Sequence, residues 1–331
     1  MNNSSTSPQG QSKATLPKQQ SYESLLRWHT SVCEEVYKKG RLGWYVLVDT
    51  NAGSGYNKEV QCDGSPVVAL NVLSTAPFPW SAFFVEQSKD SCIELAQRCM
   101  NACSKKVVIL VNTASRWNDK DFRYCNQINA EIVYVTVASL GSYVNRYVYQ
   151  DDCSLIVNFD NQIVLSRFNL RDTTYGLIYA DPNGVKDSCE QALKTFYGNG
   201  NARRVDFLIN LDGQTRKRVE CGEKKTFDQN GRTWNKDNPD EFKYFNMEAL
   251  MKNVGKKFWW VRETIPGNAR GSQWTFLFGS NYRDLKVKKL TALLCMHNID
   301  TDKGKEVLAR LKGDKFPVSQ DQQQLSLQII L

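Results

Sequence analysis

The sequence predicts an α/β fold in which a mostly parallel central sheet is flanked by helices. Two observations predict it. Segments with helical spacing of apolar residues alternate with short apolar runs rich in β-branched and aromatic residues. One such run is followed by a glycine-rich turn, a helix and a second run that ends in an acid. That order is a βαβ unit, whose right-handed crossover joins parallel strands.

The first half of the chain contains this unit. We expect an amphipathic helix from Tyr22 to Lys39, a buried strand from Trp44 to Val48 and a turn from Asp49 to Tyr56. A helix over 66–73 begins with Pro66, which suits a first helical turn, and the strand 81–85 ends at Glu86. Beyond it we expect a helix at 91–104, strands at 107–111 and 131–138, and a β-hairpin within 143–168 around Asp160-Asn161.

The second half continues the alternation. The expected strands are 177–180, 205–211 and 274–278, and the expected helices are 188–197 and 242–252. The segments 285–296 and 303–311 are expected to be helices, or a helix and a strand. Between them, 212–240 is long, polar and basic. We see no internal repeats.

Composition narrows the class of protein. The chain has 331 residues, a net charge of +8 and no apolar run of bilayer-spanning length. Its ten cysteines form no CxxC pairs, and neither His29 nor His297 belongs to a metal or triad pattern. Cys92, Cys99 and Cys103 recur at helical spacing, as reduced cysteines packed on one helix face do. We therefore expect a cytoplasmic protein with no membrane segment and no metal; the charge permits a polyanionic partner.

The first candidate site is the turn Asp49-Thr50-Asn51-Ala52-Gly53-Ser54-Gly55. Its glycines let the backbone approach a ligand at the carboxyl edge of the first strand. Glu86, at the end of the following strand, suits a carboxylate that accepts both ribose hydroxyls. These features favour a nucleoside-containing cofactor; the alternative is a structural turn with an incidental Glu.

The type of cofactor follows from a missing glycine. A dinucleotide fingerprint needs GxGxxG, so that a pyrophosphate rests on a helix N-terminus. Here Gly55 is followed by Tyr56, Asn57 and Lys58. S-adenosylmethionine (SAM) has no phosphate and needs no such cradle, so the sequence favours SAM over NAD.

The second candidate site is Asp181-Pro182-Asn183-Gly184, at another expected strand end. Carbonyl and carboxylate acceptors there can hold an exocyclic NH₂ group so that its lone pair points at a methyl donor. The alternative is a turn, which this tetrapeptide also suits well.

A third candidate is a basic surface for nucleic acid. Basic groups near a catalytic edge can hold phosphates, and an interleaved aromatic can stack on a base. The alternative is a solvated loop. The candidate residues are Arg203, Arg204, Arg216, Lys217, Arg218, Lys224, Lys225 and Trp234.

These motifs together resemble the three-Cys-motif partner protein (TcmP) family. The resemblance is carried by VDTNAGSGY, DGSPVVALNVL, FFVEQSKDSCIEL, ADPNG and VDFLINL, and its most specific piece is Gly64-Ser65-Pro66 followed by Ala69-Leu70. A weaker resemblance extends to bacterial adenine-N6 methyltransferases of ribosomal RNA or DNA. Both imply a Rossmann-like class I methyltransferase fold with insertions, of which 107–149 is one.

The resemblance also implies residue roles. Glu86 would hold the ribose, Asp160 and Asn161 would contact the adenine, and 181–184 would form the catalytic loop. Asn51 stands where the family has an aromatic residue or His, and Asn183-Gly184 stands where the methyltransferases have Pro-Tyr. The residues implied to line the SAM site are Asp49, Asn51, Ala52, Gly53, Gly55, Ser65 and Pro66.

The sequence thus predicts a SAM-dependent methyltransferase acting on an amino group of a nucleic-acid base, with adenine favoured. Two alternatives stay open: a catalytically inactive nucleic-acid-binding or accessory protein with the same fold, and a SAM-dependent transferase acting on a small molecule or protein. The expected organisation is a disordered polar tail (1–20), a SAM-binding core (21–211), a basic elaboration completing the sheet and substrate surface (212–316), and a second polar tail (317–331).

Overall fold

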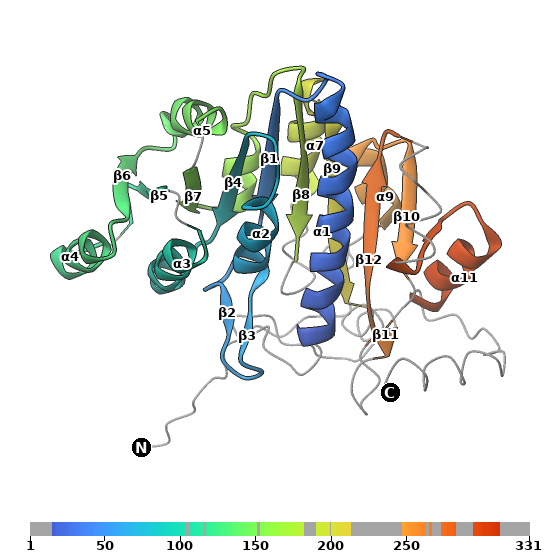
Figure 1. The fold of residues 1–331 in the computed structure, drawn as a ribbon, viewed down its shortest axis with the longest axis horizontal. Coiled ribbons are helices and arrows are strands. Elements are labelled where there is room, and N and C mark those ends of the chain that lie inside the picture. Colours follow the sequence, from blue (N-terminus) through green and yellow to red (C-terminus); the bar gives the residue numbers. More distant parts are fainter. Residues whose placement is uncertain are drawn as a thin grey trace, which may run out of the picture.

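The computed structural model describes residues 15–103, 106–115, 117–150, 153–181, 190–198, 200–212, 247–262, 265–266, 273–282 and 294–311. These residues form an eleven-stranded, mostly parallel sheet with helices on both faces (Figure 1). The predicted α/β class and mostly parallel sheet are therefore confirmed.

The strands lie in the order β6-β5-β7-β4-β1-β8-β9-β12-β10-β13, and β11 pairs with β12. From β6 to β9 all neighbouring strands are parallel, whereas β12 is antiparallel to both β9 and β10, and β13 is antiparallel to β10. A separate hairpin, β2–β3, follows β1. The bounds are β1 Trp44–Asp49, β2 Tyr56–Asn57, β3 Cys62–Asp63, β4 Trp80–Val85, β5 Lys106–Asn112, β6 Glu131–Val135, β7 Cys153–Asn158, β8 Thr174–Ala180, β9 Val205–Asp212, β10 Phe258–Arg262, β11 Ile265–Pro266, β12 Gln273–Ser280 and β13 Met296–Asn298.

The helices divide between two hydrophobic layers. One buried cluster packs α1 (Thr15–Lys38), α2 (Ser65–Leu73), α3 (Lys89–Ala102) and α4 (Asp119–Gln127) against one face of the sheet. The other packs α5, α6, α7, α9 and α11 against the opposite face. Their bounds are α5 Leu140–Val148, α6 Asn161–Leu165, α7 Glu190–Gly198, α9 Met247–Val254 and α11 Asp302–Leu311, with a 3₁₀ turn η1 at Gly200–Arg204. Cys92, Cys99 and Cys103 are buried free cysteines, as their spacing predicts.

Three parts of the predicted element order are wrong or incomplete. The segment 143–168 is not a hairpin: it contains the end of α5, then β7, which is parallel to both β4 and β5, and then α6. Asp160 is the N-cap of α6, with its side chain accepting from the Gln162 N–H, and not a turn residue. The short strand β10 was missed altogether.

The third wrong expectation concerns the N-terminal tail, because residues 15–20 already belong to α1. This extra turn and a half is tied down. The Ser21 hydroxyl donates to the Pro17 carbonyl at 2.6 Å, Gln19 is buried, and Lys18 contacts Asp181. Composition alone predicted disorder because these polar side chains find partners only in the folded sheet.

A buried polar contact fixes α1 across the sheet. His29 Nδ1 lies 3.0 Å from the Tyr45 hydroxyl, and Nε2 lies 3.2 Å from Oδ2 of Asp206, near the start of β9. Burial alone would lower the pKa of His29, but Cys33 and Asp206 raise it to about 10. Since His29 is near one end of the sheet and Lys18 near the other, α1 runs antiparallel to β9.

Candidate cofactor and substrate site

The candidate residues gather at the carboxyl edge of the parallel strands. Asp49 ends β1, Asn158 ends β7, and Glu86 and Asp181 directly follow β4 and β8. These strands are neighbours in the order β7-β4-β1-β8, so their ends lie side by side. The chain leaves β1 in one direction towards β4 and later returns on the other side to β8, and such a switch point is where open α/β sheets bind ligands.

Asp49 lies fully buried beneath the glycine-rich loop. Its Oδ2 accepts from the Ser65 hydroxyl at 2.6 Å and its Oδ1 from the Asn51 N–H at 3.1 Å. Burial raises the pKa of Asp49 to about 7; the two hydrogen bonds oppose this rise, and the nearby charges of Asp181 and Glu86 add to it. Asp49 therefore holds the loop in place rather than lying on its surface.

The loop and the start of α2 fit together through glycines. The Gly64 N–H donates to the Gly55 carbonyl at 2.8 Å, and a Cβ on Gly64 would lie 2.8 Å from the Gly55 carbonyl carbon. The next two residues also have defined tasks, since Ser65 reaches Asp49 and Pro66 occupies the first turn of α2. This explains the Gly64-Ser65-Pro66 motif in physical terms.

Gly53 is different, because its surroundings are open. Its φ is +62°, a conformation that L side chains rarely adopt, yet among the described residues a Cβ there would meet no atom beyond its chain neighbours within 4 Å. Its neighbour Ala52 is anchored, with its N–H donating to the Val85 carbonyl at 3.0 Å. The loop is thus anchored to β4 through Ala52, and the space beside Gly53 is open among the described residues.

Glu86 faces this loop. Its Oε2 accepts from the Gly53 N–H at 2.9 Å, and its Oε1 accepts from the Ser88 N–H at 2.6 Å. Burial raises its pKa, and the backbone hydrogen bonds from Ser88, Gly53 and Gln87 oppose the rise. Glu86, the acid after the second strand of the βαβ unit, is therefore joined to the loop by a direct hydrogen bond.

The predicted Asp160 and Asn161 lie at the same edge. Asp160 Oδ2 accepts from the Gln87 side chain at 3.0 Å, and the Asn161 amide is 3.4 Å from the Thr50 carbonyl. Asn158 supports the segment after β4 by donating to the carbonyls of Glu86 and Gln87, and Trp117 donates to Asn158 in turn. All ten residues predicted for the cofactor are thus brought to one edge of the sheet.

Asp181 is held from two sides. Lys18 Nζ lies 2.6 Å from its Oδ2, and the Asn210 amide nitrogen donates to its Oδ1 at 2.8 Å. Beneath them the rings of Tyr22 and Tyr179 stack with centroids 4.2 Å apart. The other three residues of the predicted catalytic loop, Pro182, Asn183 and Gly184, lie outside the described residues.

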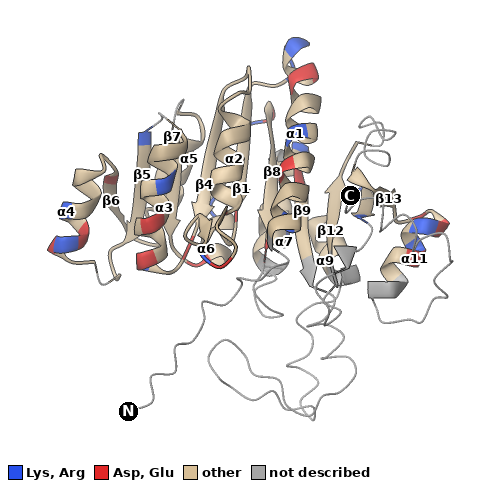
Figure 2. Cartoon of the chain, turned by 60° about the horizontal axis from the view of Figure 1, so that its bottom comes forward, with Lys and Arg blue, Asp and Glu red and all other residues tan. Residues whose placement is uncertain are grey.

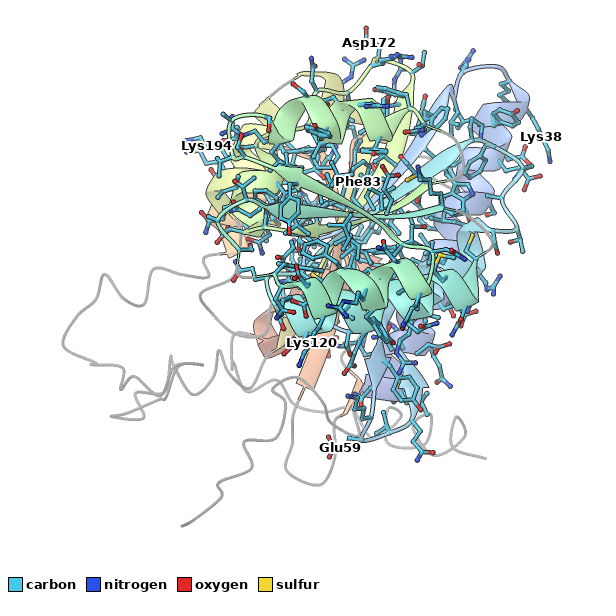
Figure 3. The ribbon with its side chains drawn as sticks, turned by 90° about the vertical axis from the view of Figure 1, so that its left-hand side faces the viewer. Lys38, Glu59, Phe83, Lys120, Asp172 and Lys194 are labelled. Atoms are coloured by element: carbon cyan, nitrogen blue, oxygen red, sulfur yellow. The ribbon has the colours of Figure 1, made fainter. Side chains whose placement is uncertain are left out.

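The basic candidates do not join this edge. Arg203 and Arg204 end η1 and precede β9, and an Arg204 N–H donates to the Asp172 carbonyl. At about 3.3 Å per residue, β9 separates Arg204 from Asn210 by roughly 20 Å. Figure 3 shows the two ends of the molecule, with Asp172 at one and Glu59 of the β2–β3 connection at the other. The expectation that these two arginines flank the catalytic edge is therefore wrong.

The remaining basic candidates cannot be placed. Arg216, Lys217, Arg218, Lys224, Lys225 and Trp234 lie outside the described residues. On the helices that are described, Lys and Arg are interspersed with Asp and Glu, as on α3, α4 and α11 (Figure 2).

Two polar residues at Asp181 were not found from the sequence. Lys18 falls in the expected tail, although Pro17 followed by good helix formers is a signal for a helix start. Asn210 lies two residues after Leu208, whose side chain packs in the α1 layer, so strand alternation places Asn210 on that same face. Nothing in the local pattern shows that both residues contact Asp181.

Comparisons with known proteins give little. No model of a known family matches the chain, and no curated protein matches it. Among solved structures, the chain is similar to a crystal structure of a Legionella pneumophila str. Philadelphia 1 protein that is assigned to the family model DUF519. The identity is 11%, the similarity covers 81% of this chain and 91% of that chain, and the TM-score is 0.39. So distant a likeness carries no functional argument.

Two structural features are absent from the described residues. No described helix is long and apolar enough to cross a membrane. Among the same residues, no group of three or more His, Cys, Asp or Glu side chains is arranged to hold a metal ion.

Proposed function

We propose that this protein is a SAM-dependent methyltransferase that acts on an amino group of a nucleic-acid base, with adenine favoured. One observation carries the proposal. Three carboxylates, Glu86, Asp49 and Asp181, stand at the ends of three adjacent parallel strands, and the glycine-rich loop lies among them.

The sheet order supports the methyltransferase class. Along β7-β4-β1-β8-β9-β10 the core strands follow the order of a doubly wound dinucleotide-binding sheet. Two features differ from that order. β5 and β6 precede β7 in the chain but lie beyond it in the sheet, and β12 is antiparallel and lies between β9 and β10.

The loop chemistry fits SAM better than a dinucleotide. Glu86 can exchange its bond to the Gly53 N–H for ribose hydroxyls, and the open side of Gly53 admits a ligand against the backbone. The carboxylates attract the sulfonium and ammonium charges of SAM, whereas they would repel a pyrophosphate. When bound, SAM supplies an electrophilic methyl group.

Asp181 suits an amine as acceptor of that group. Its carboxylate is partly exposed and has lone pairs left after its bonds to Lys18 and Asn210. An amine that donates an N–H to Asp181 is oriented for in-line attack. Asp181 would hold the amine towards the methyl group that SAM supplies. The amine would gain that methyl group, S-adenosylhomocysteine would leave, and the proton lost from the nitrogen would pass to water.

Transfer of labelled methyl groups tests the proposal. The full-length protein is incubated with methyl-tritiated SAM and, separately, with DNA and RNA oligonucleotides containing all four bases. We expect label in one of the two polymers, and its loss in Asp181→Asn and Glu86→Gln. SAM binding without transfer would favour the inactive accessory protein, and transfer to protein or small molecules alone would favour the other transferase.

A further inference from the structure

The contact between Lys18 and Asp181 joins residues 163 positions apart. Its Nζ–Oδ2 distance is 2.6 Å, and the two side chains are only 14% and 16% exposed. Lys18 lies in the second turn of α1, a helix that is anchored further along by the buried His29–Asp206 contact. The ammonium is therefore presented by a fixed element.

Lys18 and Asn210 together fix the Asp181 carboxylate. Lys18 bonds one oxygen and Asn210 bonds the other, so rotation of the carboxylate about its Cβ–Cγ bond would break both contacts. A carboxylate offers about four lone-pair sites. Among the described residues Lys18 and Asn210 donate to two of them and the Tyr179 hydroxyl also interacts with Asp181, so a site remains for another donor. The N–H of a target amine can therefore be received without displacing Lys18.

The Lys18 ammonium lies at an edge of the sheet where three carboxylates gather. Asp181 and Glu86 lie near enough to Asp49 for their charges to raise the pKa of Asp49. Lys18 brings a positive charge to Asp181 on the side of α1, so that the like charges are partly balanced before any ligand binds.

We propose that Lys18 is a positioning residue for methyl transfer, which holds the Asp181 carboxylate oriented to receive the N–H of the target amine. This inference rests on the proposed function. It gives a residue at the start of α1 a positioning role at the reaction centre. This role is separate from those proposed for the glycine-rich loop and the segment 181–184. Lys18 acts through Asp181 and does not itself touch the reacting atoms.

Three variants of the full-length protein test it. Lys18→Met removes the charge but keeps a good helix former, Lys18→Arg keeps the charge, and Lys38→Met is the matched control. Lys38 lies on the same helix and also forms an ion pair, with Glu34, but it is exposed. Calorimetry with SAM measures cofactor affinity, thermal unfolding measures folding, and tritiated-methyl transfer to the DNA and RNA oligonucleotides measures turnover.

We expect the substitution at Lys18 to change turnover much more than SAM affinity. Lys18→Met lowers kcat by about 100-fold, the loss that misplaced reacting groups produce, and leaves the SAM dissociation constant within about threefold. Lys18→Arg recovers most of the rate, and Lys38→Met matches the wild type. Combined with Asp181→Asn, Lys18→Met adds little further loss, because both act on one contact.

Other results would overturn the inference. Equal losses of SAM affinity and turnover in Lys18→Met would make Lys18 a cofactor ligand. A faster Lys18→Met enzyme would mean that Lys18 blocks Asp181 until substrate arrives. An unchanged rate would make the contact structural only. If the wild-type protein neither binds SAM nor transfers methyl groups, the proposed function itself is refuted. The measurements on the wild type therefore test the proposed function separately from the role of Lys18.

Discussion

At the scale of single residues, two glycines form a natural comparison. Gly53 and Gly40 have φ values of +62° and +66°, and in the part of the chain that the structure describes a Cβ on either would meet no atom beyond its chain neighbours within 4 Å. They differ in place, since Gly53 lies in the proposed cofactor loop and Gly40 follows the end of α1, near the opposite end of the sheet. The open space matters for a ligand only at Gly53.

Alanine at the two positions should therefore have equal effects on folding and unequal effects on binding. Each substitution should lower the free energy of unfolding by about 1–3 kcal/mol, the cost of a left-handed conformation for a non-glycine residue. We expect Gly53→Ala to weaken SAM binding by about tenfold or more in calorimetry, because its methyl group enters the ligand's space. Equal SAM affinities in the two variants would place the cofactor elsewhere.

Asp49 predicts a pH dependence of SAM binding. Its pKa is raised to about 7, so the carboxylate is protonated as the pH falls below 7 and loses its attraction for the cationic groups of SAM. Between pH 7.5 and 5.5 the affinity should fall, approaching about tenfold per pH unit at the acid end if this one charge dominates. In Asp49→Asn the affinity should be low at pH 7.5 and nearly flat; a wild-type affinity independent of pH would exclude this role.

The sequence predicted residues whose roles follow from local order. Asp49, Glu86 and Asp181 stand at the ends of apolar runs, and parallel strands bring such ends to one edge. Lys18 and Asn210 could not be predicted, because their contact with Asp181 depends on how α1 and β9 lie across β8. The prediction placed Arg203 and Arg204 at the catalytic edge. This was wrong because they precede β9, and the two ends of a strand lie at opposite edges of the sheet.

At the scale of elements, the junction of the loop and α2 is the critical contact. Because a Cβ on Gly64 would lie 2.8 Å from backbone carbon of Gly55, Gly64→Ala must push the loop and helix apart. We expect a loss of about 1–3 kcal/mol in denaturant unfolding and a marked loss of SAM affinity.

The control for this substitution is Gly141→Ala in α5, where a Cβ would meet its nearest atoms at 3.8 Å. Alanine is the better helix former, so this variant should keep its stability and SAM affinity. If Gly64→Ala behaved like Gly141→Ala, the loop would not depend on its packing against α2.

Elements with one strong periodic signal were predicted well. The runs that became β1, β4, β5 and β9 were found within a residue or two, because buried parallel strands are continuous apolar stretches. The segment 143–168 failed because alternation was read where α5 has a helical pattern, with Leu140, Val144, Tyr147 and Val148 buried. β10 was missed because it is short and lies between polar segments.

At the scale of the whole molecule, the His29–Asp206 pair ties α1 to β9 over 177 positions. The folded pKa of His29, about 10, is above its usual 6.5, so its stabilisation is fully present below pH 6.5 and is lost as the pH rises towards 10. Burial lowers the pKa of Lys256 to about 8, which opposes this trend above pH 8. Between pH 6.5 and 8 the fall therefore has two contributions, one from His29 and one from Asp49, whose pKa is raised to about 7. The difference between the wild type and a His29 variant isolates the first.

Denaturant unfolding between pH 6.5 and 8 tests the contact between His29 and Asp206. The free energy of unfolding of the wild type should fall from pH 6.5 to 8, and His29→Gln should show a smaller change. His29→Phe leaves Asp206 buried without its partner and should cost about 3–5 kcal/mol. A wild-type stability that rose across this window would contradict a charged His29 in the folded protein.

The order of the strands could not be read from the sequence. The βαβ unit predicts that β1 and β4 are neighbours and parallel, and they are. No local pattern shows that β7 separates β4 from β5, or that β12 lies between β9 and β10, since these placements depend on packing among distant segments.

The central claim is that SAM binds at the edge formed by the glycine-rich loop and Glu86. Calorimetric titration of the full-length protein at pH 7.5 with SAM, S-adenosylhomocysteine and NAD tests it most directly. We expect saturable one-site binding of SAM, competition by S-adenosylhomocysteine, a strongly reduced affinity in Glu86→Gln, and no displacement by NAD. Binding of NAD in place of SAM, or no binding of SAM, would contradict it.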